Sequence, residues 1–149
     1  MRKCIIFRTC VIFVVGMILA AIWTFLKLEF ASSAYYTKQD WLEYEFYTPG
    51  LLKKMPRVSD EYQFEFGNIT GPEAHVFSVH FQGATDSSDI RDYLKAEGYE
   101  LQKTCNLEAE CWRSYKNNDV ISIVKRLSPK EIFVDIYRSP YTVPLTDSK

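Results

Sequence analysis

Residues 62–81 read YQFEFGNITGPEAHVFSVHF, and this stretch governs the architecture of the chain around it. Large apolar residues alternate with polar ones on both sides of the central GNITGPEA, which is the period of a strand with one buried face. The apolar positions are Tyr62, Phe64, Phe66, Phe77, Val79 and Phe81. The loop between the two runs contains glycine and proline, so the pattern predicts two strands paired antiparallel.

One helix is predicted directly after these strands, over residues 87–97. The run TDSSD supplies short polar side chains that cap a helix N-terminus, and Ile90 and Leu94 follow at helical spacing. Gly98 stands where a helix ends on a residue in the left-handed conformation.

The remainder of the chain predicts further strands separated by turns at Asn117-Asn118 and Ser128-Pro129-Lys130. These strands cover residues 99–105, 111–117, 120–126 and 131–138. A single helix is then available to cover the sheet. The order of elements predicts an α+β fold, with a mostly antiparallel sheet and one main helix lying on one face.

The N-terminal stretch is of a different kind. Residues 9–26 (TCVIFVVGMILAAIWTFL) carry no charge, and as a helix they extend roughly 27 Å, close to the ~30 Å hydrocarbon core of a bilayer. Arg2, Lys3 and Arg8 precede the stretch and no acid does, which favours a cytoplasmic N-terminus. We therefore expect a single-pass protein of the inner (plasma) membrane whose C-terminal part is periplasmic or otherwise extracytoplasmic.

A cleaved secretory signal is the alternative interpretation of this stretch. Ser32 and Ala34 supply small residues at the −3 and −1 positions of a cleavage site after Ala34. The apolar run is longer than the 7–15 residues usual in signal peptides, and it ends in the bulky, charged sequence TFLKLEF. These features favour a retained anchor over a cleaved signal.

The sequence thus divides into a membrane anchor at residues 1–30, a juxtamembrane segment at 31–61 and an exported α+β domain at 62–149. Four of the 18 basic residues and one of the 19 acids lie in residues 1–30, which leaves 14 basic and 18 acidic residues beyond the anchor. This acidic balance, without a basic cluster, argues against nucleic-acid binding. It favours a protein partner, with a small molecule less expected.

Two cysteines, Cys105 and Cys111, lie in the predicted domain with NLEAE between them. In an oxidising compartment this spacing predicts a disulfide across the base of a hairpin loop, worth at most ~2–3 kcal/mol because the loop is short. Metal binding is the alternative, but two cysteines without a neighbouring histidine do not complete a zinc site.

The sequence contains no recognisable catalytic motif, and we predict no catalytic residue, metal site or cofactor. The two histidines, His75 and His80, stand five residues apart on one predicted strand and therefore point to opposite faces. Asp86, Asp89 and Asp92 are explained by a solvated first helical turn.

Aromatic residues make up 15% of the chain, and tyrosine, tryptophan and arginine dominate protein-binding hot spots. The alternative is that these side chains are half-buried residues of the sheet. The candidate partner-binding positions are Trp112, Arg113, Tyr115, Tyr137 and Arg138, with positions 107 and 109 of the NLEAE loop (Leu107 and Ala109), where the acids are Glu108 and Glu110.

Three functions compete on these grounds. The first is a membrane-anchored, exported protein-binding module, and in particular an immunity or inhibitor protein against a toxin that acts in the cell envelope. The second is a structural or assembly subunit of an envelope complex, in which Gly16 and Ala20 form a small-residue helix face. The third is an enzyme acting on envelope substrates.

Overall fold

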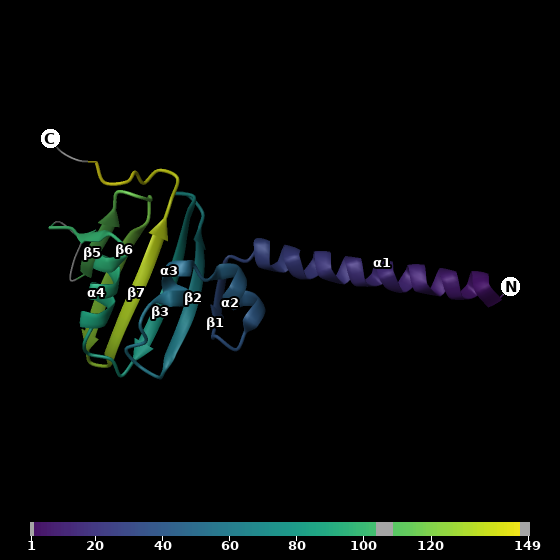
Figure 1. The fold of residues 1–149 in the computed structure, drawn as a ribbon, viewed down its shortest axis with the longest axis horizontal. Helices are drawn as coiled ribbons and strands as arrows, with labels where there is room; N and C mark the ends of the chain where they lie inside the picture. The colour runs from purple at the N-terminus through teal and green to yellow at the C-terminus, as the bar shows by residue number, and fades with distance from the viewer. Residues whose placement is uncertain (1, 104–108, 147–149) are drawn as a thin grey trace. The chain divides into compact units, whose positions relative to one another are not determined.

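The computed structural model describes residues 2–103 and 109–146. They form two compact units that divide between Ala31 and Ser32. The N-terminal unit is one helix, α1 (Arg2–Glu29), and the second unit contains the sheet and the remaining helices (Figure 1).

Helix α1 is long and apolar enough to cross a membrane. Its candidate span, Ile6–Glu29, has 24 residues, which at ~1.5 Å per residue extend ~36 Å. Its most apolar 18 residues are not buried, and the exposed apolar side chains of the helix include Ile12, Phe13, Leu19 and Trp23. This agrees with the predicted single N-terminal membrane helix.

The second unit is built on a seven-stranded sheet in which every neighbouring pair is antiparallel, in the order β1-β2-β3-β7-β6-β5-β4. The strands are β1 (Ser33–Tyr36), β2 (Tyr62–Ile69), β3 (Ala74–Gln82), β4 (Tyr99–Leu101), β5 (Ala109–Ser114), β6 (Val120–Leu127) and β7 (Lys130–Arg138). The helices are α2 (Trp41–Tyr47), α3 (Gly50–Lys54) and α4 (Ser88–Ala96).

The chain builds the sheet from two groups of strands. Strands β1 to β3 form one edge, α4 then carries the chain to the opposite edge, and β4 to β7 return strand by strand until β7 pairs with β3 (Figure 1). The predicted antiparallel α+β fold with one main helix is confirmed. The predicted helix 87–97 corresponds to α4, and Gly98 has the expected positive φ of 88°.

The core lies on one face of the sheet, where buried period-two residues of the seven strands meet. The cross-strand pairs Phe66 with Phe77, Phe77 with Ile136 and Ile136 with Ile121 run across this face. Ile90 and Leu94 of α4 are fully buried. The other fully buried side chains include Phe64, Val79, Phe81, Trp112, Ile123, Ile132 and Val134.

Residues 32–61 belong to the same compact unit as the later strands, although the sequence analysis set residues 31–61 apart as a juxtamembrane segment. Strand β1 pairs with β2, and aromatic rings join α2 to the sheet. The Tyr47 ring stacks on Phe66 at 4.4 Å, and Tyr44 meets Phe64 edge-on at 5.3 Å. The period-two signal of a four-residue strand is too short to be recognised from sequence.

Several strand boundaries differ from those expected. Strands β2 and β3 continue into GNITGPEA, so that Ile69 pairs with Ala74 and only four residues remain in the turn. Gly71 and Glu73 adopt positive φ there, at 109° and 49°. Strand β4 ends at Leu101, before the expected residue 105, and residues 104–108 lie outside the described residues.

Candidate interaction surface

The two faces of the sheet have different neighbours. Tyr44 and Tyr47 of α2, Leu52 of α3 and Leu94 of α4 are buried on the core side, and α3 and α4 lie on the same side of the sheet in Figure 1. We call this side the covered face. No described helix packs on the other side, which we call the uncovered face. Its residues include Tyr35, Gln63, Glu65, Val76, Ser78, His80, Cys111, Arg113, Val120, Ser122, Val124, Phe133, Asp135 and Tyr137.

A polar row crosses the middle of the uncovered face. Tyr35, Glu65, Ser78, Asp135 and Ser122 occupy successive register positions on five neighbouring strands. Burial raises the pKa of Asp135, hydrogen bonds from Ser78 and Ser122 oppose this shift, and the charge of Glu65 adds to it. The Tyr35 hydroxyl donates to Glu65, which raises the pKa of that hydroxyl. Glu65 and Asp135, whose negative charges repel each other, thus lie beside hydroxyl groups that donate hydrogen bonds to them.

The next row of the uncovered face is aromatic. The His80 and Phe133 rings stack with their centroids 4.1 Å apart and their planes within 11°. His80 Nε2 lies 3.3 Å from Glu131 Oε1, and the Arg126 guanidinium lies 5.1 Å from the centre of the Phe133 ring. At this end of the face the positive charge of Arg126 therefore balances the negative charge of Glu131.

A small hollow of about 70 Å³ opens between these two rows. It is lined by Tyr35, Glu65, Ser78 and Asp135 of the polar row, by Gln63, His80 and Phe133 of the next row, and by Phe64 of β2, whose side chain belongs to the core. Small-molecule sites usually enclose ~300–1,000 Å³. This hollow is therefore suited to a single side-chain head group.

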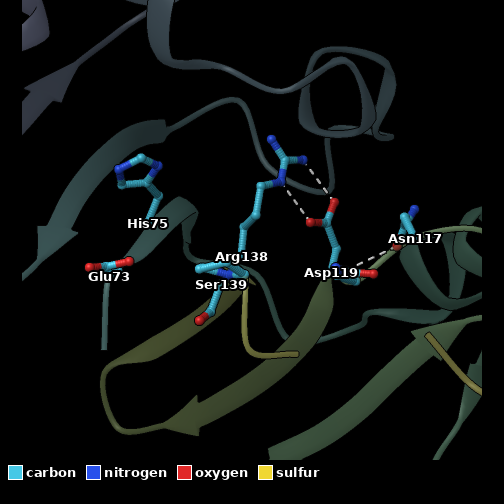
Figure 2. Close-up of a pocket in the computed structure, with 8 residues that line it drawn as sticks. Glu73, His75, Asn117, Asp119, Arg138 and Ser139 are labelled. Atoms are coloured by element: carbon cyan, nitrogen blue, oxygen red, sulfur yellow. Dashed lines mark hydrogen bonds and ion pairs between the residues drawn. The ribbon is translucent and has the colours of Figure 1, made fainter. Parts of the chain in front are cut away.

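A larger hollow of about 650 Å³ lies at the end of the covered face, near the start of β3 and the end of β7 (Figure 2). Arg138 is the charged residue at its centre in Figure 2. The Arg138 Nε and Nη2 donate to the two carboxylate oxygens of Asp119 at 2.7 and 2.8 Å. Figure 2 shows His75 and Glu73 on the other side of Arg138 from Asp119.

The groups around Arg138 form a connected network. The Asp119 backbone N–H donates to Asn117 Oδ1 at 3.1 Å, and Asn117 Nδ2 donates to the Tyr99 hydroxyl at 2.8 Å. Hydrogen bonding to Asp119 raises the pKa of Arg138. Because Asp119 takes up two of the guanidinium donors, the pair fastens the 115–119 turn to β7 and leaves Arg138 little net charge for a ligand.

The structure separates the candidate partner-binding residues. Trp112 is 1% exposed in the core, and Arg138 lies at the end of the covered face. Burial removes Trp112 from the residues that a partner can touch without unfolding the domain. Arg113 and Tyr137 share one cross-strand row of the uncovered face through Val120. Tyr115 is 46% exposed, and its hydroxyl lies 3.4 Å from Glu100.

The C-terminal residues lie beside this row. The Arg113 guanidinium donates to the Val143 carbonyl, and the Leu145 backbone N–H donates to the Ser114 carbonyl at 3.1 Å. The last described residues are thus fastened to the end of β5.

The NLEAE loop and its flanking cysteines are described only in part. Position 107 and Cys105 lie outside the described residues, so the Cys105–Cys111 disulfide stays a prediction. Position 109 is Ala109, the first residue of β5, and Glu110 lies 3.0 Å from Arg91 of α4 in an ion pair without hydrogen-bond alignment. Cys111 is half-buried on the uncovered face.

Sequence reasoning missed the polar row, although each member alternates with buried residues. Asp135 stands between Val134 and Ile136, and Ser122 stands between Ile121 and Ile123. This alternation places each polar residue on the solvent side of its strand. Bringing them into one row requires the strand order and register, because β7 becomes the neighbour of β3 only after α4 has crossed the sheet.

Within the part of the chain that the structure describes, no group of three or more His, Cys, Asp or Glu residues is placed to hold a metal ion. Comparisons with protein-family models, curated proteins and solved structures found no match to this chain. The interpretation of the surface therefore depends on its own geometry and chemistry.

Proposed function

We propose that this chain is a membrane-anchored protein-binding module that engages its partner through the uncovered face of the sheet. The observation that carries the proposal is the difference between the two faces. Helices from the same chain cover one face, whereas the other keeps Tyr137, Val124, Phe133 and Arg113 half-buried and open to a second molecule. Tyrosine and arginine are among the residue types on which protein interfaces depend most.

The membrane location of this module is supported by α1, whose candidate span is long enough to cross a bilayer. The basic residues Arg2, Lys3 and Arg8 precede the span, which supports a cytoplasmic N-terminus and an extracytoplasmic domain. In this orientation the domain lies on the outer side of the inner membrane.

A disulfide between Cys105 and Cys111 belongs to the same proposal. The far side of the membrane is oxidising, and a bond there closes the short NLEAE loop beside β5. Cys10 is exposed on α1 within the apolar stretch and has no cysteine partner among the described residues. It therefore serves as the reference thiol when Cys105 and Cys111 are tested by alkylation.

An immunity or inhibitor protein against an envelope-acting toxin is the form of this function that we favour. The anchor confines the domain to the membrane surface, which raises its local concentration where such a toxin arrives. The acidic domain, with 18 acids against 14 basic residues, also favours association with a basic partner.

An assembly subunit of an envelope complex is the second candidate, and Gly16 is the observation that favours it. A side chain added at Gly16 would meet nothing within 4 Å, so a neighbouring helix has space to approach the backbone there. Replacing residues 9–26 by an unrelated membrane span separates the candidates, because a binding module keeps its partner and a helix-packing subunit loses it.

Crosslinking in intact cells, followed by capture of the tagged full-length chain, tests the binding surface. The variant Tyr137→Ser/Val124→Ser removes apolar area from the uncovered face, and we expect at least a fivefold loss of the captured partner. The control Asp92→Ala/Lys95→Ala changes an exposed ion pair on α4 and should capture as the wild type does. Equal capture by all three proteins excludes the uncovered face as the binding surface.

Thiol alkylation of intact cells tests orientation and oxidation together. A membrane-impermeant maleimide should leave Cys105 and Cys111 unmodified until a reductant is added. Modification without reductant contradicts the disulfide, and modification that also requires cell lysis contradicts the proposed orientation.

A further inference from the structure

Two carboxylates at the centre of the uncovered face lack a basic partner. Neither Glu65 nor Asp135 forms an ion pair within residues 2–103 and 109–146. The two arginines of this face are engaged elsewhere, Arg113 with the Val143 carbonyl and Arg126 3.6 Å from Glu131. The middle of the face therefore carries negative charge that the described chain does not neutralise.

The protein holds these carboxylates under conditions that disfavour their charge. Asp135 is half-buried, and its pKa is raised first by burial and further by the charge of Glu65. Ser78 lies between the two acids in the register and can donate only one hydrogen bond. A cation placed between them would relieve both the burial of charge and the mutual repulsion.

The size of the hollow limits what that cation can be. About 70 Å³ suits the head of one side chain and is too small for an ordinary cofactor or metabolite. A metal ion is disfavoured because no group of three or more His, Cys, Asp or Glu residues is placed to hold one among the described residues. An ammonium or guanidinium group on a side chain brings its own charge and enters from the open side.

We propose that the hollow between Glu65 and Asp135 receives the basic head group of a lysine or arginine side chain from the protein partner. The inference rests on the proposed function and specifies the chemistry of that partner. Strands lie ~4.8 Å apart, so the Cα atoms of Glu65 and Asp135, two strands apart, are separated by about 10 Å. This spacing lets both carboxylates reach one cation above Ser78.

The walls of the hollow favour arginine over lysine. The Tyr35 ring, 67% exposed, offers aromatic surface for a planar guanidinium, and the Phe133 ring, which His80 and Arg126 already flank, lines the same hollow. The fork of N–H donors can reach two carboxylates at once, whereas an ammonium acts as a point charge. The partner should therefore present a protruding arginine, surrounded by apolar residues that contact Val124 and Tyr137.

Titration with capped tripeptides tests the pocket without knowledge of the partner. The ¹⁵N-labelled full-length chain in zwitterionic detergent micelles is titrated with acetyl-Gly-Arg-Gly-amide and with the uncharged analogue that carries citrulline in place of arginine. The arginine peptide should shift the backbone amides of Glu65, Ser78 and Asp135 saturably, and at least tenfold more tightly than the citrulline peptide. Equal affinities, or no shift with either peptide, overturn the proposal.

Two variants and one metal control sharpen this titration. Glu65→Gln and Asp135→Asn should each weaken the arginine peptide at least fivefold, whereas Asp92→Asn on α4 should leave it unchanged. The variants are expected to fold, because they remove unneutralised charge and keep an amide oxygen that can accept the hydrogen bonds from Tyr35, Ser78 and Ser122. Calcium chloride is the counter-probe. Saturation of the same amides at a lower calcium concentration than that of the peptide would make the hollow a metal site and overturn the proposal.

Capture in cells separates failure of this inference from failure of the proposed function. One outcome is that Glu65→Gln/Asp135→Asn still captures the partner while Tyr137→Ser/Val124→Ser does not. The uncovered face is then the interface, but the acidic hollow does not bind a basic side chain. If both double variants keep the partner, the proposed function fails as well. Loss in both variants, together with arginine-selective peptide binding, supports the whole assignment.

Discussion

The two faces of the sheet are built from the same strands, but their side chains are buried in different ways. On the covered face one cross-strand row reads Phe66, Phe77, Ile136 and Ile121, whereas the adjacent row of the uncovered face reads Glu65, Ser78, Asp135 and Ser122. Helices α2, α3 and α4 complete the first row with apolar side chains of the same chain. The second row is half-buried by neighbouring strands alone, and its charge is not neutralised within the described residues. A partner can cover the second row with its side chains, as the helices of the same chain cover the first.

The largest expected contrast is between the same substitution on the two faces. Phe64→Ala removes a ring with 0% exposure and should destabilise the fold by about 3–5 kcal/mol, since it leaves a cavity among Tyr36, Tyr44 and Tyr62. Phe133→Ala removes a half-buried ring whose place water can fill, and should cost about 1 kcal/mol. Urea unfolding of the full-length chain in detergent, followed by near-ultraviolet circular dichroism, measures both.

Equal losses for the two phenylalanine variants would contradict the comparison. They would mean that the uncovered face is packed as tightly as the core, which requires a covering element of the same chain. Such an element would also occupy the surface that we assign to a partner.

The ion pair at the end of the covered face should have an intermediate effect. Arg138→Ala leaves the buried Asp119 carboxylate unpaired, and because Arg138 is about half exposed we expect a loss of about 1–2 kcal/mol. The matched control is Arg126→Ala on the uncovered face, whose 61% exposed side chain lies 3.6 Å from Glu131, with an expected loss below about 0.5 kcal/mol.

A double variant shows whether the Arg138 effect belongs to the pair. Asp119→Asn/Arg138→Ala removes the buried charge together with its partner, so it should recover part of the stability that Arg138→Ala alone loses. If the double variant is less stable by the sum of the losses measured for Arg138→Ala and Asp119→Asn alone, the two side chains act independently and the pair does not fasten the 115–119 turn.

The architecture was predictable where apolar periodicity is long. Residues 62–66, 77–81 and 87–97 each show a clear period, and the strands and helix expected there are present. Strand β1 was not predicted because four residues are too few to show a period. Its place in the sheet depends on Tyr36 stacking against Phe64, 28 positions further along the chain. The short helix α2 likewise gains its stability from the tertiary contacts of Tyr44 and Tyr47.

The candidate surface was predictable only residue by residue. Composition identified Arg113 and Tyr137 as binding types, and the register places them in one row, but it could not distinguish them from Trp112, which alternation assigns to the core. Glu65 and Asp135 are 70 positions apart and were not singled out at all. Their proximity results from β7 pairing with β3, a long-range contact that no local pattern encodes.

The smallest expected effect is also the one most specific to the uncovered face. Asp135→Asn keeps a group that can accept from Ser78 or Ser122 but removes a half-buried charge, so it should stabilise the free protein, by less than about 1 kcal/mol. The raised pKa of Asp135 fixes the sign of the pH dependence. Below the ordinary value of 3.8 the carboxyl is protonated in both folded and unfolded states, and the variant gains nothing.

As the pH rises from there through the raised pKa of Asp135, the unfolded state gives up its proton first and wild-type stability falls relative to the variant. The titratable groups near Asp135 on the uncovered face are Glu65 of β2, His80 of β3 and Tyr137 of β7 itself, and the charge of Glu65 adds to the raised pKa of Asp135. Urea unfolding from pH 3 to pH 8 should therefore be repeated in the Glu65→Gln background, where the gain should shrink because one repulsion is already removed. A loss of stability in Asp135→Asn at neutral pH would mean that the carboxylate already has a favourable partner within the chain. The uncovered face would then be complete in the way the covered face is.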